Sequence, residues 1–138
     1  ASLGLAKGFM KTLRTEKKGK FKGYINLKLH AWAPFVLIIR AFAMKNKVIK
    51  TGTIERIDEL VRLGAFSNEA GAKLKNSFYL LSRFKIYTQV MYLIGKYESD
   101  IYLNPEDLTD SEKDQLIDTL SQIESLQNLL VESMGLRI

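Results

Sequence analysis

The sequence predicts an all-α protein, built as an antiparallel bundle of four to five helices. Apolar residues recur at three- and four-residue spacings over most of the chain, and the segments between these stretches are short. Only one short stretch alternates apolar and polar residues as a strand would. Because the 138 residues contain no linker rich in Gly, Ser or Pro, we expect a single domain, with a helix and a basic loop in 1–23 and the bundle core in 24–138.

The first quarter of the chain has the weakest helical pattern. Residues 2–14 place four apolar side chains at roughly helical spacing, although two glycines reduce the helical propensity. Residues 15–23 are basic and interrupted by glycine, which is typical of a flexible loop. Residues 24–29 alternate apolar and polar side chains and predict a short extended segment.

Two helices follow this segment. Pro34 suits the first turn of a helix that ends near Asn46 and is apolar nearly all round, so we expect it to be the most buried helix. Thr53 is a suitable cap for a second helix over residues 54–63, and Gly64 is a suitable stop.

The second half of the chain has the clearest helix signals. The longest helix should begin at Ser67 or Asn68, run to about Glu98 and form the spine of the bundle. Asn104-Pro105 predicts a single capped turn, and residues 109–112 (TDSE) match the capping box, in which Thr and Glu bond each other's backbone amides. A leucine-rich last helix should then end near Gly135.

Charge is distributed unevenly. The net charge is +6, but residues 1–50 hold twelve Lys and Arg and one acid, whereas residues 99–138 hold two basic residues and nine acids. The two ends can attract each other within one fold, or the basic half can face an anionic partner. In the basic run 17–24, aromatic residues alternate with lysines, which suits nucleic-acid or phosphate binding, but a solvated loop is the favoured interpretation.

The residues needed for a self-sufficient active site are missing. The chain has no cysteine and one histidine, His30, which excludes thiolate chemistry, disulfides and two-histidine metal sites. The glycines form no phosphate-binding pattern, and the paired acids near the predicted helix starts are explained by capping. We expect no signal peptide and no membrane span, and the composition fits a cytoplasmic protein.

Cations that lie among apolar residues are the best candidates for binding. Arg40 lies in the first core helix, and Arg83 and Lys85 lie midway along the long helix, with Gln89 one turn further on. Buried cations must be paired, either in internal salt bridges to Glu55, Asp58 or the acidic last helix, or in a polar groove that binds a ligand. Both interpretations stay open from the residues alone.

Five blocks of sequence, in this order and spacing, resemble a known family. They are residues 25–28 (INLK), 34–43 (PFVLIIRAFA), 53–57 (TIERI), 82–89 (SRFKIYTQ) and 104–109 (NPEDLT), followed by the leucine-rich helix. The chain resembles the substrate-binding domain of bacterial nucleotidyltransferases over roughly residues 9–133. In that family the domain accompanies a catalytic core similar to that of the protein-PII uridylyltransferases, together with CBS or cyclic-nucleotide-binding-like modules in signal-transduction proteins.

The resemblance implies a helical accessory domain that helps to shape the acceptor or nucleotide cleft and has no catalytic residues or cofactor of its own. Mg²⁺ and a nucleoside triphosphate are expected at the separate catalytic domain, so the parent protein is expected to be the transferase. Substrate-binding candidates are Lys28, Arg40, Arg56, Arg83, Lys85 and Gln89. The sequence departs from the family pattern at Asn26 and Leu37, where acids are usual, and at Tyr87-Thr88, where an Arg-His pair is usual.

Two other functions fit the same residues. The chain can be a regulatory or protein-interaction module with no ligand of its own, or a helical domain that binds nucleic acid. The acidic last helix argues against a large continuous basic face, so nucleic acid is the less favoured partner. The expected partner is a catalytic domain in the same parent chain. A nucleotide, a protein acceptor and a second copy of the chain in a homodimer are further candidates, and no membrane partner is expected.

Overall fold

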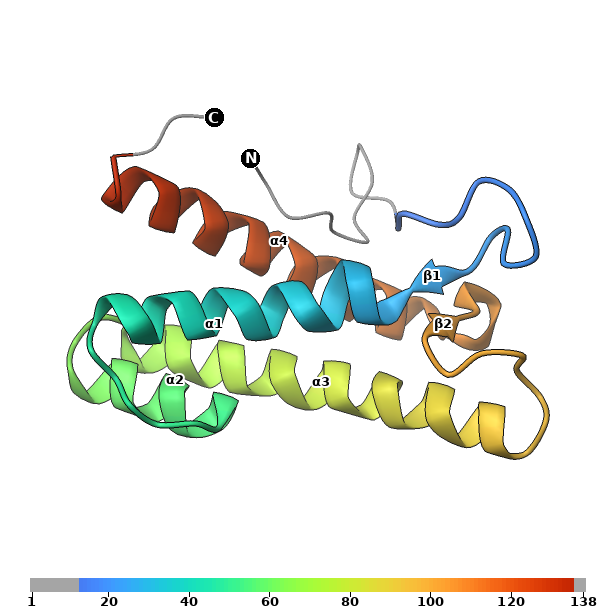
Figure 1. The fold of residues 1–138 in the computed structure, drawn as a ribbon, viewed down its shortest axis with the longest axis horizontal. Coiled ribbons are helices and arrows are strands. Elements are labelled where there is room, and N and C mark those ends of the chain that lie inside the picture. The colour runs from blue at the N-terminus through green and yellow to red at the C-terminus, as the bar shows by residue number, and fades with distance from the viewer. Residues whose placement is uncertain (1–12, 136–138) are drawn as a thin grey trace.

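The computed structural model describes residues 13–135 and confirms a predominantly helical fold, in which four helices pack together beside a minor pair of strands (Figure 1). The elements in chain order are β1 (Ile25–Asn26), the π-helical turn η2 (Lys28–Trp32), α1 (Ala33–Lys45), α2 (Thr53–Arg62), α3 (Asn68–Leu93), β2 (Tyr102–Leu103), the 3-10 turn η3 (Pro105–Asp107) and α4 (Asp110–Ser133).

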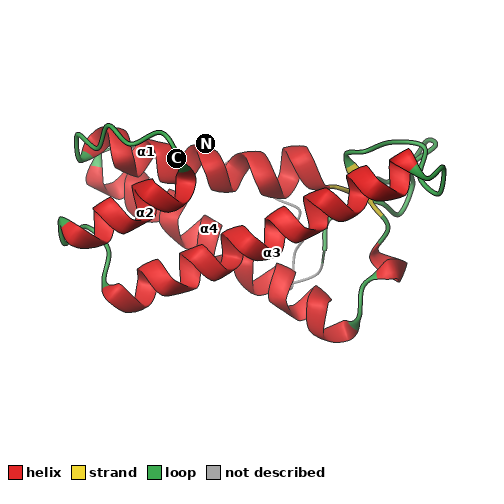
Figure 2. Cartoon of the chain, turned by 90° about the horizontal axis from the view of Figure 1, so that it is seen from below, coloured by secondary structure: helices red, strands yellow, loops and turns green. Residues whose placement is uncertain are grey.

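Helix α3 is the spine of the bundle, as the sequence predicted. It runs beside α1 in the opposite direction, and the short α2 packs against both (Figure 1). Seen from below, α4 crosses α3 at an angle (Figure 2). The space between these helices is filled by fully buried aliphatic and aromatic side chains, among them Phe35, Ile39, Leu60, Leu81 and Ile123.

The strand pair brings together segments that are far apart in the sequence. β1 and β2 are antiparallel, with Ile25 opposite Leu103 and Asn26 opposite Tyr102. Just beyond the pair, the Leu27 amide donates to the Ile101 carbonyl oxygen at 2.9 Å. The chain before α1 is therefore fixed against the connection between α3 and α4.

The prediction of an extended segment over residues 24–29 was only partly right. The strand ends at Asn26, and Leu27 already has helical backbone angles. The buried Asn26 side chain explains the change, because its Oδ1 accepts a hydrogen bond from the Leu29 amide at 3.0 Å and so begins the turn η2. Pro34 then lies in the first turn of α1, as predicted.

Helix α1 buries a larger share of its residues than any other helix in the described part of the chain, as predicted, although Leu37 and Met44 on one face are exposed. Two predictions about helix ends need correction. Helix α2 begins at Thr53, and Gly52 takes the cap position. Helix α3 ends at Leu93 rather than near Glu98, because Gly95 adopts φ 78°, which stops the helix.

The ends of the last two helical elements match the predictions. The Asn104 side chain accepts from the Glu106 amide, and the capping box between Thr109 and Glu112 is complete in both directions. The predicted helix over residues 2–14 falls almost wholly outside the described residues, and residues 13 and 14 are not helical.

The basic loop before β1 has a defined hydrogen-bonding pattern. The Glu16 amide donates to the Tyr24 carbonyl oxygen, and the Gly23 amide donates to the Glu16 carbonyl oxygen, both at 2.9 Å. The Phe21 ring stacks on Tyr102 with ring centroids 4.1 Å apart. This contact fixes the lysine-bearing loop against β2.

Candidate functional site

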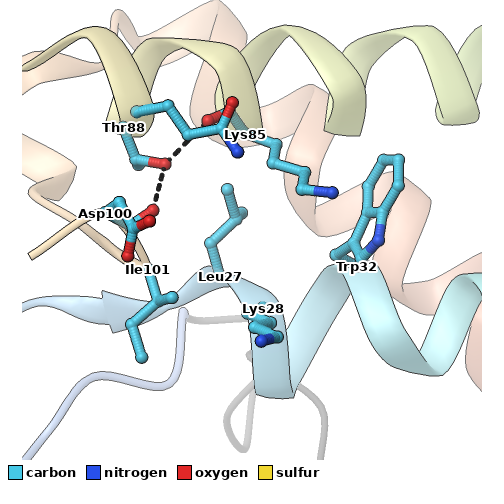
Figure 3. A pocket seen from close by; sticks show the side chains of 8 residues that line it. Leu27, Lys28, Trp32, Lys85, Thr88, Asp100 and Ile101 are labelled. Atoms are coloured by element: carbon cyan, nitrogen blue, oxygen red, sulfur yellow. Dashed lines mark hydrogen bonds between the residues drawn. The ribbon is translucent and has the colours of Figure 1, made fainter. Parts of the chain in front are cut away.

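A pocket of about 240 Å³ lies where η2, α3 and the segment before β2 meet (Figure 3). Its walls combine two cations, an amide, a hydroxyl, a carboxylate and three apolar side chains. The residues are Leu27, Lys28, Trp32, Lys85, Thr88, Gln89, Asp100 and Ile101. Three of the six residues that the sequence suggested for binding, Lys28, Lys85 and Gln89, are thus brought together.

The two lysines reach the pocket from different elements. Lys28 begins the turn η2, and Lys85 lies midway along α3. The Lys85 Nζ lies 4.2 Å from the centroid of the Trp32 ring, a cation–π contact, and that ring also packs near Phe78, with ring centroids 5.3 Å apart. Within residues 13–135, neither lysine has a carboxylate partner, because the ion pairs there use other cations. Both ammonium groups are therefore available to an anion.

The buried hydroxyl of Thr88 fixes the pocket wall. Its Oγ1 lies 2.8 Å from the Lys85 carbonyl oxygen and 2.7 Å from the Asp100 carbonyl oxygen, so one proton is shared between two acceptors. The bond to Asp100 ties the segment before β2 to α3, and the bond between Leu27 and Ile101 ties it to η2. The pocket is thus held on both sides by hydrogen bonds.

The pocket lining is cationic and rich in hydrogen-bonding groups. Two lysines against the exposed Asp100 leave an excess of one positive charge, and Gln89 adds an amide that both donates and accepts. In the part of the chain that the structure describes, no group of three or more His, Cys, Asp and Glu side chains is placed to hold a metal ion. The lining therefore offers the cationic and amide donors that suit an anion.

The other three candidate residues lie elsewhere. Arg40 is exposed on α1, which contradicts the expectation that it is buried. The Arg56 Nε donates to the Lys50 carbonyl oxygen at 2.8 Å. Arg83 pairs with Glu112 of the acidic last helix at 3.4 Å, but its side chain is 61% exposed, so this is a surface ion pair and the expectation that Arg83 is buried was wrong.

Arg83 borders a second pocket, of about 130 Å³, on another flank of α3. Beside it, the Asp107 Oδ2 accepts hydrogen bonds from the hydroxyls of Tyr97 at 2.6 Å and Tyr87 at 3.1 Å. Burial, with the nearby Asp107 carboxylate adding to it, raises the pKa of Tyr97 and of Tyr87 above the ordinary value. This network ties α3 and the residues after it to η3.

Sequence reasoning missed Trp32, Thr88 and Asp100 as members of the pocket. Trp32 follows Lys28 by four residues, which places the two side chains on one side of a helical turn, but the segment that includes Lys28 was predicted to be extended. Thr88 was noted only as a departure from the family pattern. Asp100 had no local signal, because only the pairing of β1 with β2 brings it near η2.

The family model described as putative nucleotidyltransferase substrate binding domain matches residues 3–134. The chain belongs to this family. Neither a curated protein nor a solved structure matches the chain. None of the helices over residues 13–135 combines the length and apolar character needed to span a membrane.

Proposed function

We propose that this chain is the accessory substrate-binding domain of a larger nucleotidyltransferase and that the pocket around Lys28 and Lys85 forms its part of the substrate cleft. The observation that carries the proposal is that Gln89 and two lysines, neither with a carboxylate partner within residues 13–135, line one pocket in a member of this family. Such a pocket binds and orients an anionic substrate, which is how an accessory domain contributes to transfer.

The chemical step belongs to another domain in this proposal. Nucleotidyl transfer uses carboxylates that hold divalent cations at the reacting phosphate. The described residues contain no such group of side chains. Mg²⁺ and the nucleoside triphosphate are therefore assigned to the catalytic domain of the parent chain.

The outer face of α3 is the proposed contact with that catalytic domain. Tyr79, Ile86, Val90 and Leu93 are exposed large side chains, and their spacings of seven, four and three residues place them on one side of the helix. This apolar stripe lies opposite the residues that α3 buries, such as Leu81 and Phe84 in the core. An exposed stripe of this kind is typical of a surface that a partner covers.

The test joins the domain to the catalytic domain of its parent and measures nucleotidyl transfer. We expect Lys28→Met and Lys85→Met each to raise the KM for one substrate about tenfold, since each removes a charge-assisted hydrogen bond. Lys73→Met, an exposed charge on α3 outside the pocket, is the matched control. If both pocket variants fold normally and leave KM and kcat at the control's values, the pocket has no role in the substrate cleft.

The exposed stripe on α3 also supports a second function, that of a regulatory or protein-interaction module with no ligand of its own. The two functions give different results in one assay. If Ile86→Glu changes the activity of the joined protein while Lys28→Met and Lys85→Met do not, the domain acts through protein contact alone.

A further inference from the structure

The composition of the pocket narrows the kind of substrate that it takes. We propose that it binds a small molecule that carries a single phosphate or carboxylate group and, beside it, a hydroxyl or amine, and that it does not bind the nucleoside triphosphate. This assignment rests on the function proposed above, because it names the substrate of the same pocket.

The two lysines define the anionic end of this ligand. Lys28 and Lys85 stand on separate elements, and both line the pocket (Figure 3). An ammonium group presents three donors around a point charge, which suits a single compact oxyanion. The present contact of Lys85 with Trp32 is a weak competitor for such an anion, because the ring offers only a quadrupole.

Asp100 defines the other end of the ligand. Its carboxylate is exposed beside the pocket and has no ion-pair partner among the described residues. An ionised carboxylate only accepts hydrogen bonds, so it favours a hydroxyl or an amine and repels additional negative charge. The Thr88 hydroxyl bonds the Asp100 carbonyl oxygen at 2.7 Å, so the backbone that carries this carboxylate is held in place before any ligand arrives.

These features disfavour a nucleoside triphosphate. Its three phosphates need several cations or a bound metal ion, whereas the pocket has an excess of one positive charge and no metal-holding group among the described residues. The volume, about 240 Å³, is below the range of roughly 300–1,000 Å³ typical of sites for larger ligands. A small acceptor, or the reactive end of a larger one, fits both limits.

The chain has a built-in reporter for this pocket. Trp32 is the only tryptophan in the sequence, and its ring contacts the Lys85 ammonium group. An anion that draws Lys85 away will change both the tryptophan fluorescence and the indole N–H resonance of the 138-residue chain. The probes are glycerol 3-phosphate, glycerate, inorganic phosphate, glycerol and Mg·ATP, titrated one at a time.

We expect glycerol 3-phosphate or glycerate to give a saturable change, and the stronger of the two identifies the oxyanion as phosphate or carboxylate. Glycerol should give none. Lys28→Met and Lys85→Met should each weaken binding about tenfold, and Lys73→Met should leave it unchanged. Asp100→Asn should strengthen binding of inorganic phosphate and reduce the preference for glycerol 3-phosphate over phosphate.

Three results overturn the assignment. The first is saturable binding of Mg·ATP that depends on the same lysines and is tighter than the binding of either oxyanion probe. The nucleotide would then be the ligand of the pocket, and the proposed accessory function would still stand. The second is no lysine-dependent change with any probe. The third is an unchanged preference in Asp100→Asn. The proposed accessory function is tested separately, in the transfer assay of the joined protein, where normal turnover in the pocket variants would contradict it. A wrong ligand assignment and a wrong function are therefore distinguishable.

Discussion

The hydrogen bond from Tyr97 to Asp107 should be one of the strongest single contributions to the stability of the region beside the pocket. Tyr97 is 8% exposed, and its hydroxyl donates to the Asp107 Oδ2 at 2.6 Å while accepting from the Asn104 amide at 3.2 Å. Its ring packs edge-on against Tyr24 and Tyr87. Tyr97→Phe keeps the ring and removes only the hydroxyl, which isolates the hydrogen bonds.

The expected loss follows from the charge on Asp107. A hydrogen bond to a charged group contributes about 1.5–3 kcal/mol, so we expect Tyr97→Phe to lower the free energy of unfolding by about 2 kcal/mol. For a domain of this size that corresponds to a fall in Tm of about 8 °C. Tyr87→Phe is the matched control, because its hydroxyl donates to the same oxygen at 3.1 Å from a more exposed position, and it should lose about 0.5–1 kcal/mol.

Stability at high pH provides a second measurement. Burial raises the pKa of Tyr97 in the folded protein, so in alkaline solution the unfolded chain loses this proton first. The stabilisation is complete below the ordinary tyrosine pKa of about 10 and is lost as the pH rises above it. Wild type should therefore lose stability more steeply above pH 10 than Tyr97→Phe does.

Urea unfolding followed by circular dichroism, at pH 8 and at several values above pH 10, measures both effects. A cycle with Asp107→Asn then separates the pair from the single changes. If Tyr97→Phe costs no more than Tyr87→Phe, and the two pH curves of wild type and Tyr97→Phe coincide, the assigned role of this hydrogen bond is wrong.

Three other substitutions have definite expected outcomes. A Cβ at Gly71 would lie 2.4 Å from the Val61 Cγ2, so Gly71→Ala should cost about 1–3 kcal/mol in thermal unfolding, and the double variant with Val61→Ala should recover most of it. Thr88→Val leaves the Asp100 carbonyl oxygen without its donor, so it should lower the free energy of unfolding by about 1–2 kcal/mol. It should also weaken the ligand binding that tryptophan fluorescence reports. If stability and binding are both unchanged, the role given to this hydroxyl is wrong. The hydrogen bond from the Thr109 amide lowers the pKa of Glu112, so the ionised Glu112 stabilises the folded protein above about pH 4.5 and this contribution is lost as the pH falls. Thr109→Ala removes the other half of the capping box and should lower the free energy of unfolding at pH 7 by about 1 kcal/mol.

Local signals account for the parts of the fold that the sequence predicted. The capping box at Thr109 and the turn at Asn104 depend on side chains that bond backbone groups two or three residues away. The four helices follow from apolar spacing within each segment. Such features need no knowledge of the rest of the chain, which is why they were predictable.

Arg40 shows why periodicity should have outweighed composition. The segment around it is so apolar that Arg40 was expected to be buried, yet Leu37, Arg40 and Met44 share one exposed face at spacings of three and four residues. The presence of a charged residue on that face was the available indication. A single cation in an apolar helix marks the side that is not in the core.

The pocket needed information that no local pattern contains. Its wall at Asp100 and Ile101 meets Leu27 only because β1 pairs with β2 across most of the chain. Lys28 and Trp32 share one side because Asn26 begins a helical turn, although the alternation of residues 24–29 indicated a strand. Three of the six binding candidates, Lys28, Lys85 and Gln89, line this pocket, and their role in binding stays a prediction.

Helix α3 links the proposed pocket to the proposed contact surface. Lys85 and Gln89 line the pocket, while Ile86 and Val90, the next residues along, belong to the exposed apolar stripe. A partner that covers the stripe would therefore lie close to the pocket, and we expect it to influence ligand binding. Thermodynamic linkage then requires that ligand binding and docking of the catalytic domain change each other's affinity by the same factor. Weaker docking in Ile86→Glu should accordingly abolish any effect of the catalytic domain on ligand affinity, while the isolated chain keeps its own affinity, because the pocket itself is built without the stripe.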